Sequence, residues 1–383
     1  MAIAATAFNP RKTIISTSLQ LLGANKGIIC QSSSFWCPNF CNSRVKARYE
    51  SRVLSAKLAS DVIVHERVSE TATGSDNLLG WREFCENVSG EWDGYGADFS
   101  SEGEPIELPE SVVPEAFREW DVKVFDWQTQ CPTLAETEEP KLVYKPTKLL
   151  PTVGCEADAA TSYSIEERWI GGGNNGASTF SYHPSGCYVA VWPVDKHGLL
   201  ELEYCLVDPG NRESRTRISR TRIIQVVEVE KDNGEQKTVM RLRNIKVFSE
   251  QWYGPFRNGE QLGGCAISGS GFATTDVLKD SEVTGSWESQ IFVASFKNSQ
   301  HELFRELVDQ MPQKVTRDLC DLVLLPKQLW CSLKENTIGE TWGEVGCLAG
   351  PGNVITSRCV FSKNGVLQEM AIGYESRNSE NEE

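Results

Sequence analysis

The sequence has few of the residues that build metal and redox centres. It contains only four histidines and four methionines, and its thirteen cysteines include no Cys-x-x-Cys pair. The histidines also lack the spacing of a His-x-His or His-Glu-x-x-His site. The sequence therefore predicts no metal and no other cofactor. The cysteines of apolar segments are expected to be buried free thiols.

Catalytic and nucleotide-binding motifs are missing as well. There is no Gly-x-Ser-x-Gly elbow, and the glycine-rich segment 171–176 lacks the Gly-Lys-Ser/Thr ending of a phosphate loop. The longest uncharged run outside the N-terminal segment, residues 169–194, contains three consecutive glycines and two prolines. Such a run is a poor membrane-spanning helix, so we expect neither catalysis nor stable membrane insertion.

Acidic residues are absent from the first 49 positions, which hold six lysines and arginines and are rich in serine, threonine and alanine. This composition is typical of an organelle transit peptide. We interpret residues 1–47 as a plastid transit peptide, with a mitochondrial one as the alternative, and residues 48–77 as a linker. The expected location is the chloroplast stroma.

The rest of the chain is strongly acidic. Without the N-terminal segment, 32 Lys and Arg oppose 53 Asp and Glu, a net charge of −21. This sign disfavours nucleic acid as a main partner, because phosphate binding requires basic residues. Residues 376–383 are expected to form a disordered acidic tail.

Short apolar runs separated by Gly, Pro, Asn and Asp turns follow one another between residues 78 and 375. This pattern indicates antiparallel β-structure. We expect a first β-barrel domain at 78–248 and a second at 249–375. Asn233-Gly234 predicts a hairpin that places Arg222 near Asn244.

One or two short helices accompany the strands in this prediction. One follows Ser75-Asp76 and ends before Gly90, since its apolar residues have near-helical spacing. Another begins at the capping box of residues 299–302 and continues through the apolar positions of 303–308.

A cluster of arginines stands out in this acidic chain. Its members are Arg212, Arg215, Arg217, Arg220, Arg222, Arg241 and Arg243. Clustered guanidinium groups suit bidentate contacts with carboxylates, so this cluster is a candidate docking patch for an acidic partner or for the carboxylates of a ligand. The alternative is that the arginines pair with acids of this same chain.

Tryptophans that follow a glycine by two positions occur in both halves, at Trp92 and Trp287. A tryptophan on the first strand of a small barrel can close one end of its core, and we expect Trp92 to be such a structural plug. The recurrence of the pattern also hints at a duplicated architecture.

Five loose motifs together resemble the lipocalin-like (calycin) domain family of cyanobacteria and plastids. They are Trp81-x-x-Phe84, Gly90-Glu-Trp92-x-Gly94, Phe99-x-x-x-Gly103, Gly198-x-Leu-Glu201 and Asn211-Arg212-x-x-Arg215. The resemblance extends from about Leu78 to Glu375. It implies two calycin β-barrels in tandem and a chloroplast protein.

The resemblance to the chloroplast branch of this family implies a non-catalytic role. The expected role is that of a stromal assembly factor that binds the β and γ subunits of the chloroplast ATP synthase. The alternative is a carrier of a tetrapyrrole, bilin or lipid, or a bilin lyase-like enzyme, in which the arginines hold propionates and Cys187 or Cys205 takes part. A glycan- or lipid-binding sandwich is a third interpretation, based on the many tryptophans.

Overall fold

The computed structural model describes residues 76–151, 162–208, 218–232, 237–260, 270–297 and 304–377. The segments interpreted as transit peptide and linker lie outside these ranges, apart from Asp76 and Asn77, and so does the tail after Arg377. All described residues belong to one compact unit. Its secondary structure is mainly β, as the turn and strand pattern predicted.

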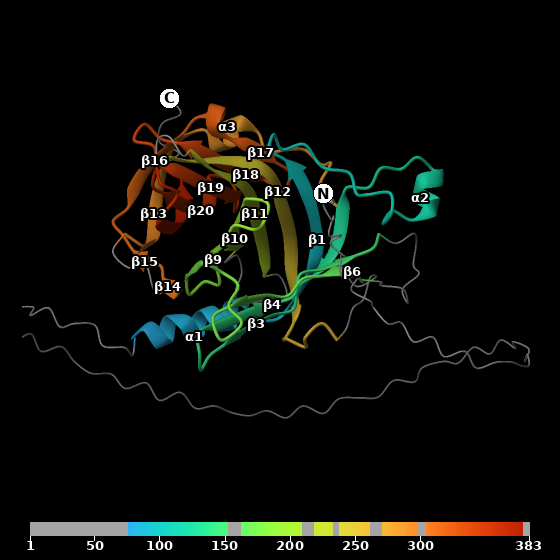
Figure 1. Cartoon of the computed structure of the whole chain (residues 1–383), viewed down its shortest axis with the longest axis horizontal. Helices are drawn as coiled ribbons and strands as arrows, with labels where there is room; N and C mark the ends of the chain where they lie inside the picture. The colour runs from blue at the N-terminus through green and yellow to red at the C-terminus, as the bar shows by residue number, and fades with distance from the viewer. Residues whose placement is uncertain are drawn as a thin grey trace, which may run out of the picture. The chain divides into compact units, whose positions relative to one another are not determined.

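The first sheet has ten strands (Figure 1). Nine of them come from the first half of the chain, and β14 is contributed by the second half. In spatial order they are β14 (Phe304–Glu306), β8 (Thr179–Tyr182), β9 (Tyr188–Trp192), β10 (Leu199–Val207), β11 (Ser219–Asp232), β12 (Lys237–Gly254), β1 (Glu91–Ser100), β2 (Asp126–Gln130), β5 (Thr147–Leu149) and β6 (Ser162–Ile165).

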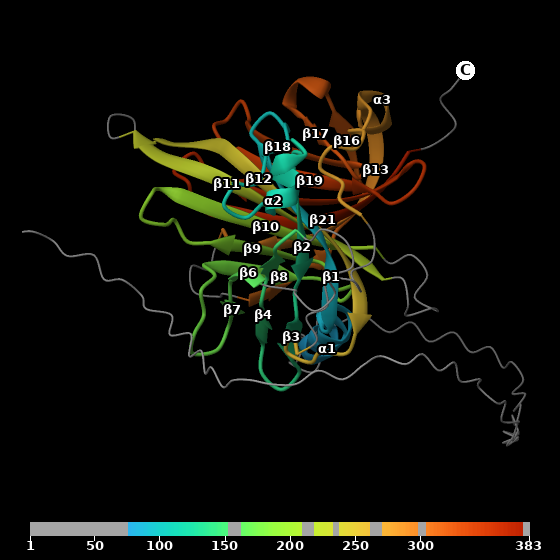
Figure 2. The same ribbon diagram turned by 90° about the vertical axis from the view of Figure 1, so that its right-hand side faces the viewer.

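The second sheet has eight strands, all from the second half of the chain. They are β15 (Val308–Asp309), β13 (Gly285–Ser295), β21 (Leu367–Ser376), β20 (Asn353–Phe361), β19 (Thr341–Leu348), β18 (Leu329–Glu335) and β17 (Val323–Leu325), with β16 (Gln313–Arg317) also pairing with β13. A third, three-stranded sheet consists of β3 (Thr133–Glu136), β4 (Lys141–Tyr144) and β7 (Arg168–Ile170), seen side by side in Figure 2.

The helices are short. The expected first helix is α1 (Asp76–Val88), which buries Trp81, Phe84 and Val88. Two others, α2 (Glu115–Glu119) and α3 (Asp280–Val283), have five and four residues, and a 3-10 helix covers Leu319–Asp321.

The second expected helix is wrong for the residues that the structure describes. Its capping box and Leu303 lie outside the described residues, while Phe304 belongs to the strand β14 and Val308 to the strand β15. Phe304 of β14 pairs in parallel with Phe180 of β8 and packs edge-on against Phe180 and Trp81. A strand pairing between the two halves and a shared aromatic cluster thus outweigh the local helical pattern.

Both halves begin with the same construction. A helix ends at Val88 or Val283, a glycine with positive φ follows two residues later, and the next strand, β1 or β13, buries a tryptophan. The indole N–H donates back to the helix-terminal carbonyl, from Trp92 to Val88 (3.0 Å) and from Trp287 to Val283 (2.8 Å). Each of these first strands pairs with the last strand of its half, β12 or β21. The geometry therefore supports the expected duplication.

The expectation of two closed barrels is corrected by the strand pairing. Within the described residues the sheets are open, with β14 and β6 as the outer strands of the ten-stranded sheet. The reason is that β10 is buried on both faces. Leu202 and Tyr204 turn toward the second sheet, where the Tyr204 hydroxyl bonds to the carbonyl oxygen of Gly343 (3.1 Å). Apolar residues are thereby covered by the neighbouring sheet rather than by barrel closure.

One hydrophobic core joins the two halves. It contains Leu202 and Val227 from the first half together with Val345 and Ile372 from the second. The predicted domain boundary between residues 248 and 249 falls inside β12, a continuous strand of 18 residues. The halves thus correspond largely to two sheets, but they share their interior.

Candidate functional site

The structure separates the arginines that were expected to form one patch. Arg212, Arg215 and Arg217 lie outside the described residues. Arg241 and Arg243 are exposed on β12 and pair with acids of the neighbouring strand β11, Arg241 with Glu230 and Arg243 with Glu228 (3.6 Å).

Arg220 and Arg222 are not surface residues, and their place in a docking patch is corrected. Both are about 1% exposed and bond to Glu250 of β12. The Nε–Oε2 distances are 2.7 Å from Arg220 and 2.9 Å from Arg222. Arg222 lies opposite Phe248 rather than Asn244, because Asp232 pairs with Lys237 and a bulge follows Val226, and both shift the register.

A second carboxylate, Glu203 of β10, continues this cluster. It is fully buried and accepts bonds from five donors. They are the Tyr144 hydroxyl (2.6 Å), the Tyr188 hydroxyl (3.0 Å), the Trp192 indole N–H (3.0 Å), Arg168 (3.0 Å) and Arg222 (3.3 Å). We call Arg168, Glu203, Arg220, Arg222 and Glu250 the buried ion-pair cluster. It lies between the ten-stranded sheet and the three-stranded sheet, because Tyr144 and Arg168 belong to β4 and β7.

The positive and negative charges of the buried ion-pair cluster compensate one another. Burial by itself raises the pKa of Glu250, but the charges of Arg220 and Arg222 and their hydrogen bonds lower it to about 2. Burial likewise opposes ionisation of Glu203, and Arg168 and Arg222 bring its pKa below the ordinary value. Both carboxylates are therefore ionised at neutral pH, and no proton is available for acid catalysis from them.

Trp92 belongs to the same interior. It is about 1% exposed, and the guanidinium of Arg220 stacks over its ring at 4.3 Å. Its burial agrees with the expected structural role, although it covers the core of an open sheet rather than the end of a barrel. The second half has a similar arrangement, in which buried Arg317 bonds to Glu375 of β21 and stacks on Trp330 (4.6 Å).

The two cysteines of the alternative interpretation are buried. Cys187 has no exposed surface, and its sulfur accepts a bond from the Val207 N–H (3.1 Å). Burial raises the pKa of Cys205 well above its ordinary value. A buried protonated thiol is a weak nucleophile, and Arg220 and Arg222 already have carboxylate partners within the chain. These observations do not favour a covalent bilin site at these residues.

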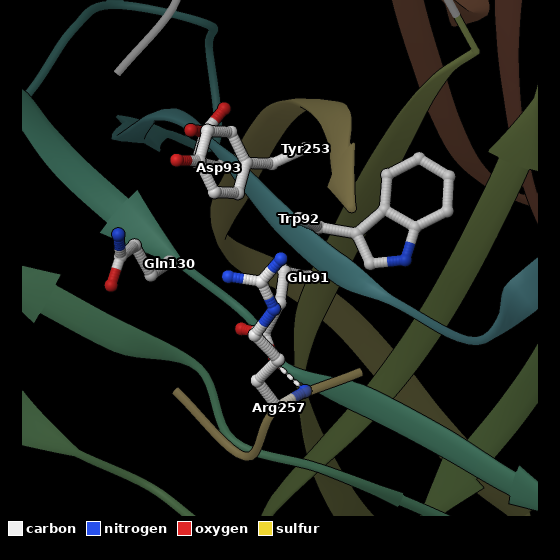
Figure 3. Close-up of a pocket in the computed structure, with 6 residues that line it drawn as sticks. All are labelled: Glu91, Trp92, Asp93, Gln130, Tyr253 and Arg257. Carbon is white, nitrogen blue, oxygen red and sulfur yellow. Dashed lines mark hydrogen bonds between the residues drawn. The ribbon is translucent and has the colours of Figure 1, made fainter. Parts of the chain in front are cut away.

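A small cleft lies where β1, β2 and the end of β12 meet (Figure 3). Its volume is about 10 Å³, the space of roughly one water molecule. Glu91 accepts bonds from the backbone N–H groups of Arg257 and Gly259 at its edge. The cleft is too small for an organic ligand.

A larger surface feature is the segment between β1 and β2. We call residues 104–124, which include α2, the α2 lobe; α2 stands at the right of Figure 1, outside the sheet. The lobe has a small core of its own around Leu108, Val112 and Val113, which packs on Trp127 of β2. A backbone bond from the Ile106 N–H to the Asp98 carbonyl of β1 (2.8 Å) attaches it to the sheet, and a bond from the Leu108 N–H to the Val124 carbonyl (2.8 Å) closes the lobe internally. The lobe is thus a structured projection.

The α2 lobe combines exposed apolar side chains with acidic ones. Ile106, Trp120 and Val122 are 42%, 62% and 46% exposed. The lobe carries six acidic and two basic side chains. A cleft of about 330 Å³ opens on it. The cleft is lined by Glu107, Leu108, Glu110, Val113, Arg118, Asp121, Val122 and Lys123.

The alternative interpretation, in which the arginines pair with acids of this same chain, is confirmed for the four that the structure describes. The sequence did not identify the buried partners, and it did not indicate the α2 lobe. The partners of the arginines were signalled by Glu201 and Glu203, two acids inside the otherwise apolar run 199–207. The Pro-rich acidic segment 105–114 was visible, but nothing in its sequence indicated that Trp120 would be left exposed.

Comparisons with known proteins give little further information. No protein-family model matches the chain, and no curated protein matches it. A crystal structure of a DUF3598-family protein of unknown function from Nostoc punctiforme is 12% identical, covering 78% of this chain and 99% of that one, with a TM-score of 0.45. A putative outer membrane protein from Bacteroides fragilis is 7% identical over 77% and 99% of the two chains, with a TM-score of 0.16. At these TM-scores neither likeness bears on the function.

The described residues lack two further features. No group of three or more His, Cys, Asp or Glu residues in them is arranged to hold a metal ion. None of the helices in the described part of the chain is long and apolar enough to cross a membrane.

Proposed function

We propose that this chain is a non-catalytic assembly factor of the chloroplast stroma that binds the β and γ subunits of the ATP synthase. The observation that carries a protein-binding role is the α2 lobe, which presents exposed Trp120 beside a cleft of about 330 Å³. Tryptophan is enriched among the residues that dominate binding energy in protein interfaces. The choice of partners and compartment rests on the family resemblance and on the composition of residues 1–49.

The body that holds the lobe suits this role. The buried ion-pair cluster and the shared core fix the ten-stranded sheet, so the lobe is presented on a rigid support. A rigid binding surface loses little conformational entropy when a partner docks.

The proposed family fold is a pair of lipocalin-like sheets that have opened and merged. Its support is the repeated construction at Trp92 and Trp287 and the pairing of the first strand with the last in each half.

The test is immunoprecipitation of the tagged protein from chloroplast stroma, followed by mass spectrometry. We expect enrichment of the β and γ subunits over a mock precipitation from untagged stroma. Recovery of neither subunit above that background, with the protein itself recovered, would contradict the proposed partners.

A further inference from the structure

We infer that the α2 lobe is a docking site for a basic protein segment that also carries an apolar side chain. This inference rests on the proposed function, since it names the chemistry of the partner that the same surface takes. It is argued from the shape of the cleft, the exposure of Trp120 and the charge of the lobe.

The cleft has the size and lining of a side-chain binding site. Its volume of about 330 Å³ is at the lower end of the range of small-ligand pockets. Buried Leu108 and Val113 give it an apolar base, while Glu110 and Asp121 line it with carboxylates. This combination accepts the aliphatic stem of a lysine or arginine together with its charged end.

Trp120 provides the apolar anchor beside the cleft. It ends α2, is 62% exposed and meets Phe117 edge-on with ring centroids 6.4 Å apart. The following residue, Asp121, adopts φ +53°, which reverses the chain toward Val122. An exposed indole binds both aliphatic side chains and, through its face, cations.

The charge of the lobe selects the sign of the partner. Six acids against two bases give it a net charge of −4. Only one of the acids that line the cleft, Glu107, forms an ion pair among the described residues, with Lys123 (3.5 Å). Charge complementarity therefore favours a basic segment and rejects an acidic one.

The experiment measures fluorescence anisotropy of a short fluorescein-labelled peptide of alternating arginine and leucine, titrated with the full chain. We expect saturable binding that weakens with salt. Trp120→Ala should weaken binding about tenfold, as expected for loss of an interface anchor, and Trp120→Phe should recover part of it. A Trp120→Ala affinity equal to that of the parent protein would overturn the inference.

A matched pair of double variants separates the site from the general acidity of the protein. Glu110→Gln with Asp121→Asn neutralises two acids of the cleft. Glu86→Gln with Glu230→Gln neutralises two exposed acids on α1 and β11. We expect the first double variant to weaken peptide binding and to reduce its salt dependence. The second double variant should leave both the affinity and its salt dependence unchanged. Equal losses would show that the peptide senses net charge alone and would refute the site.

The same variants distinguish this inference from the proposed function. If the parent protein captures the β and γ subunits and Trp120→Ala captures them equally, the inference fails and the function stands. If the peptide binds at the lobe but neither subunit is captured, the proposed partners fail and the inference stands. Circular dichroism of each variant checks the fold. We expect the fold to be unchanged in the Trp120 variants, because this side chain is exposed.

Discussion

Glu250 is a single carboxylate that compensates the charges of two buried arginines. It is the acceptor for both Arg220 and Arg222, and all three side chains are removed from water. Among the described residues, Glu250 is the one carboxylate paired with Arg220, and Arg222 also pairs with Glu203 (3.3 Å). Removing one member of such a buried pair leaves an uncompensated charge, which is far more costly than the net contribution of the intact pair.

We therefore expect Glu250→Gln to lower the free energy of unfolding by about 3–5 kcal/mol. Glu230→Gln, which removes an exposed ion pair on the neighbouring strand, should change it by less than about 1 kcal/mol. Urea denaturation followed by tryptophan fluorescence measures both. Equal effects of the two variants would show that burial of the cluster does not matter for stability.

Stability should also depend on pH through Glu250. Its pKa is lowered from 4.5 to about 2 by folding, so its contribution is present above about 4.5 and is lost as the pH falls toward 2. The parent protein should lose stability over this window, and Glu250→Gln should lose less of it. Unfolding midpoints measured at several pH values check the sign. A variant whose losses match those of the parent would contradict the assignment to Glu250.

The junction between helix and first strand is the element that both halves share. Gly90 has φ +145°, and a Cβ there would lie 2.2 Å from Nε1 of Trp252. Gly285 has φ +103°, but the nearest atom to an added Cβ is 3.9 Å away, on Arg377. The first junction is therefore constrained by both conformation and packing, and the second by conformation alone.

Gly90→Ala should accordingly destabilise the protein more than Gly285→Ala, whose cost is that of the strained backbone, about 1–3 kcal/mol. Gly173→Ala is the control, because an added Cβ there meets nothing within 4 Å. Thermal unfolding of the three variants gives the order. A Gly285→Ala variant that is at least as unstable as Gly90→Ala would contradict the packing argument.

The sequence was sufficient to predict helices and strands whose type follows from the local pattern of residues. The apolar spacing after Asp76 identified α1, and the alternation and turns identified a mainly β chain. Prediction from the sequence failed at Phe304, where a parallel pairing with β8 overrides a helical pattern. It offered two interpretations for Arg220 and Arg222, a docking patch and pairing with acids of this chain, and it could not show that the second holds in a buried interior. Alternation shows which residues share a face, and only tertiary packing shows that both faces of β10 and its neighbours are covered.

At the scale of the whole molecule, the shared core makes the two sheets dependent on each other. Tyr204 and Gln225 of the first sheet bond to backbone carbonyls of Gly343 and Ser332 in the second (3.1 and 2.9 Å). Separating the halves would expose these polar groups and the apolar side chains around them.

We therefore expect residues 76–377 to unfold in one cooperative transition, with equal calorimetric and van't Hoff enthalpies. Neither 78–248 nor 249–375 should fold when it is produced alone, and each should bind a hydrophobic dye. Two resolved transitions in calorimetry, or a cooperatively folded fragment, would show that the halves are independent domains.

The position of the α2 lobe in the chain has a consequence for how such a protein can diversify. The lobe leaves the sheet after β1 and returns as β2, and these strands are antiparallel neighbours. It is an elaborated hairpin loop, so its length and composition can vary while every other strand keeps its path. Recognition can then evolve at this one insertion, and the charged interior, which tolerates little change, need not follow.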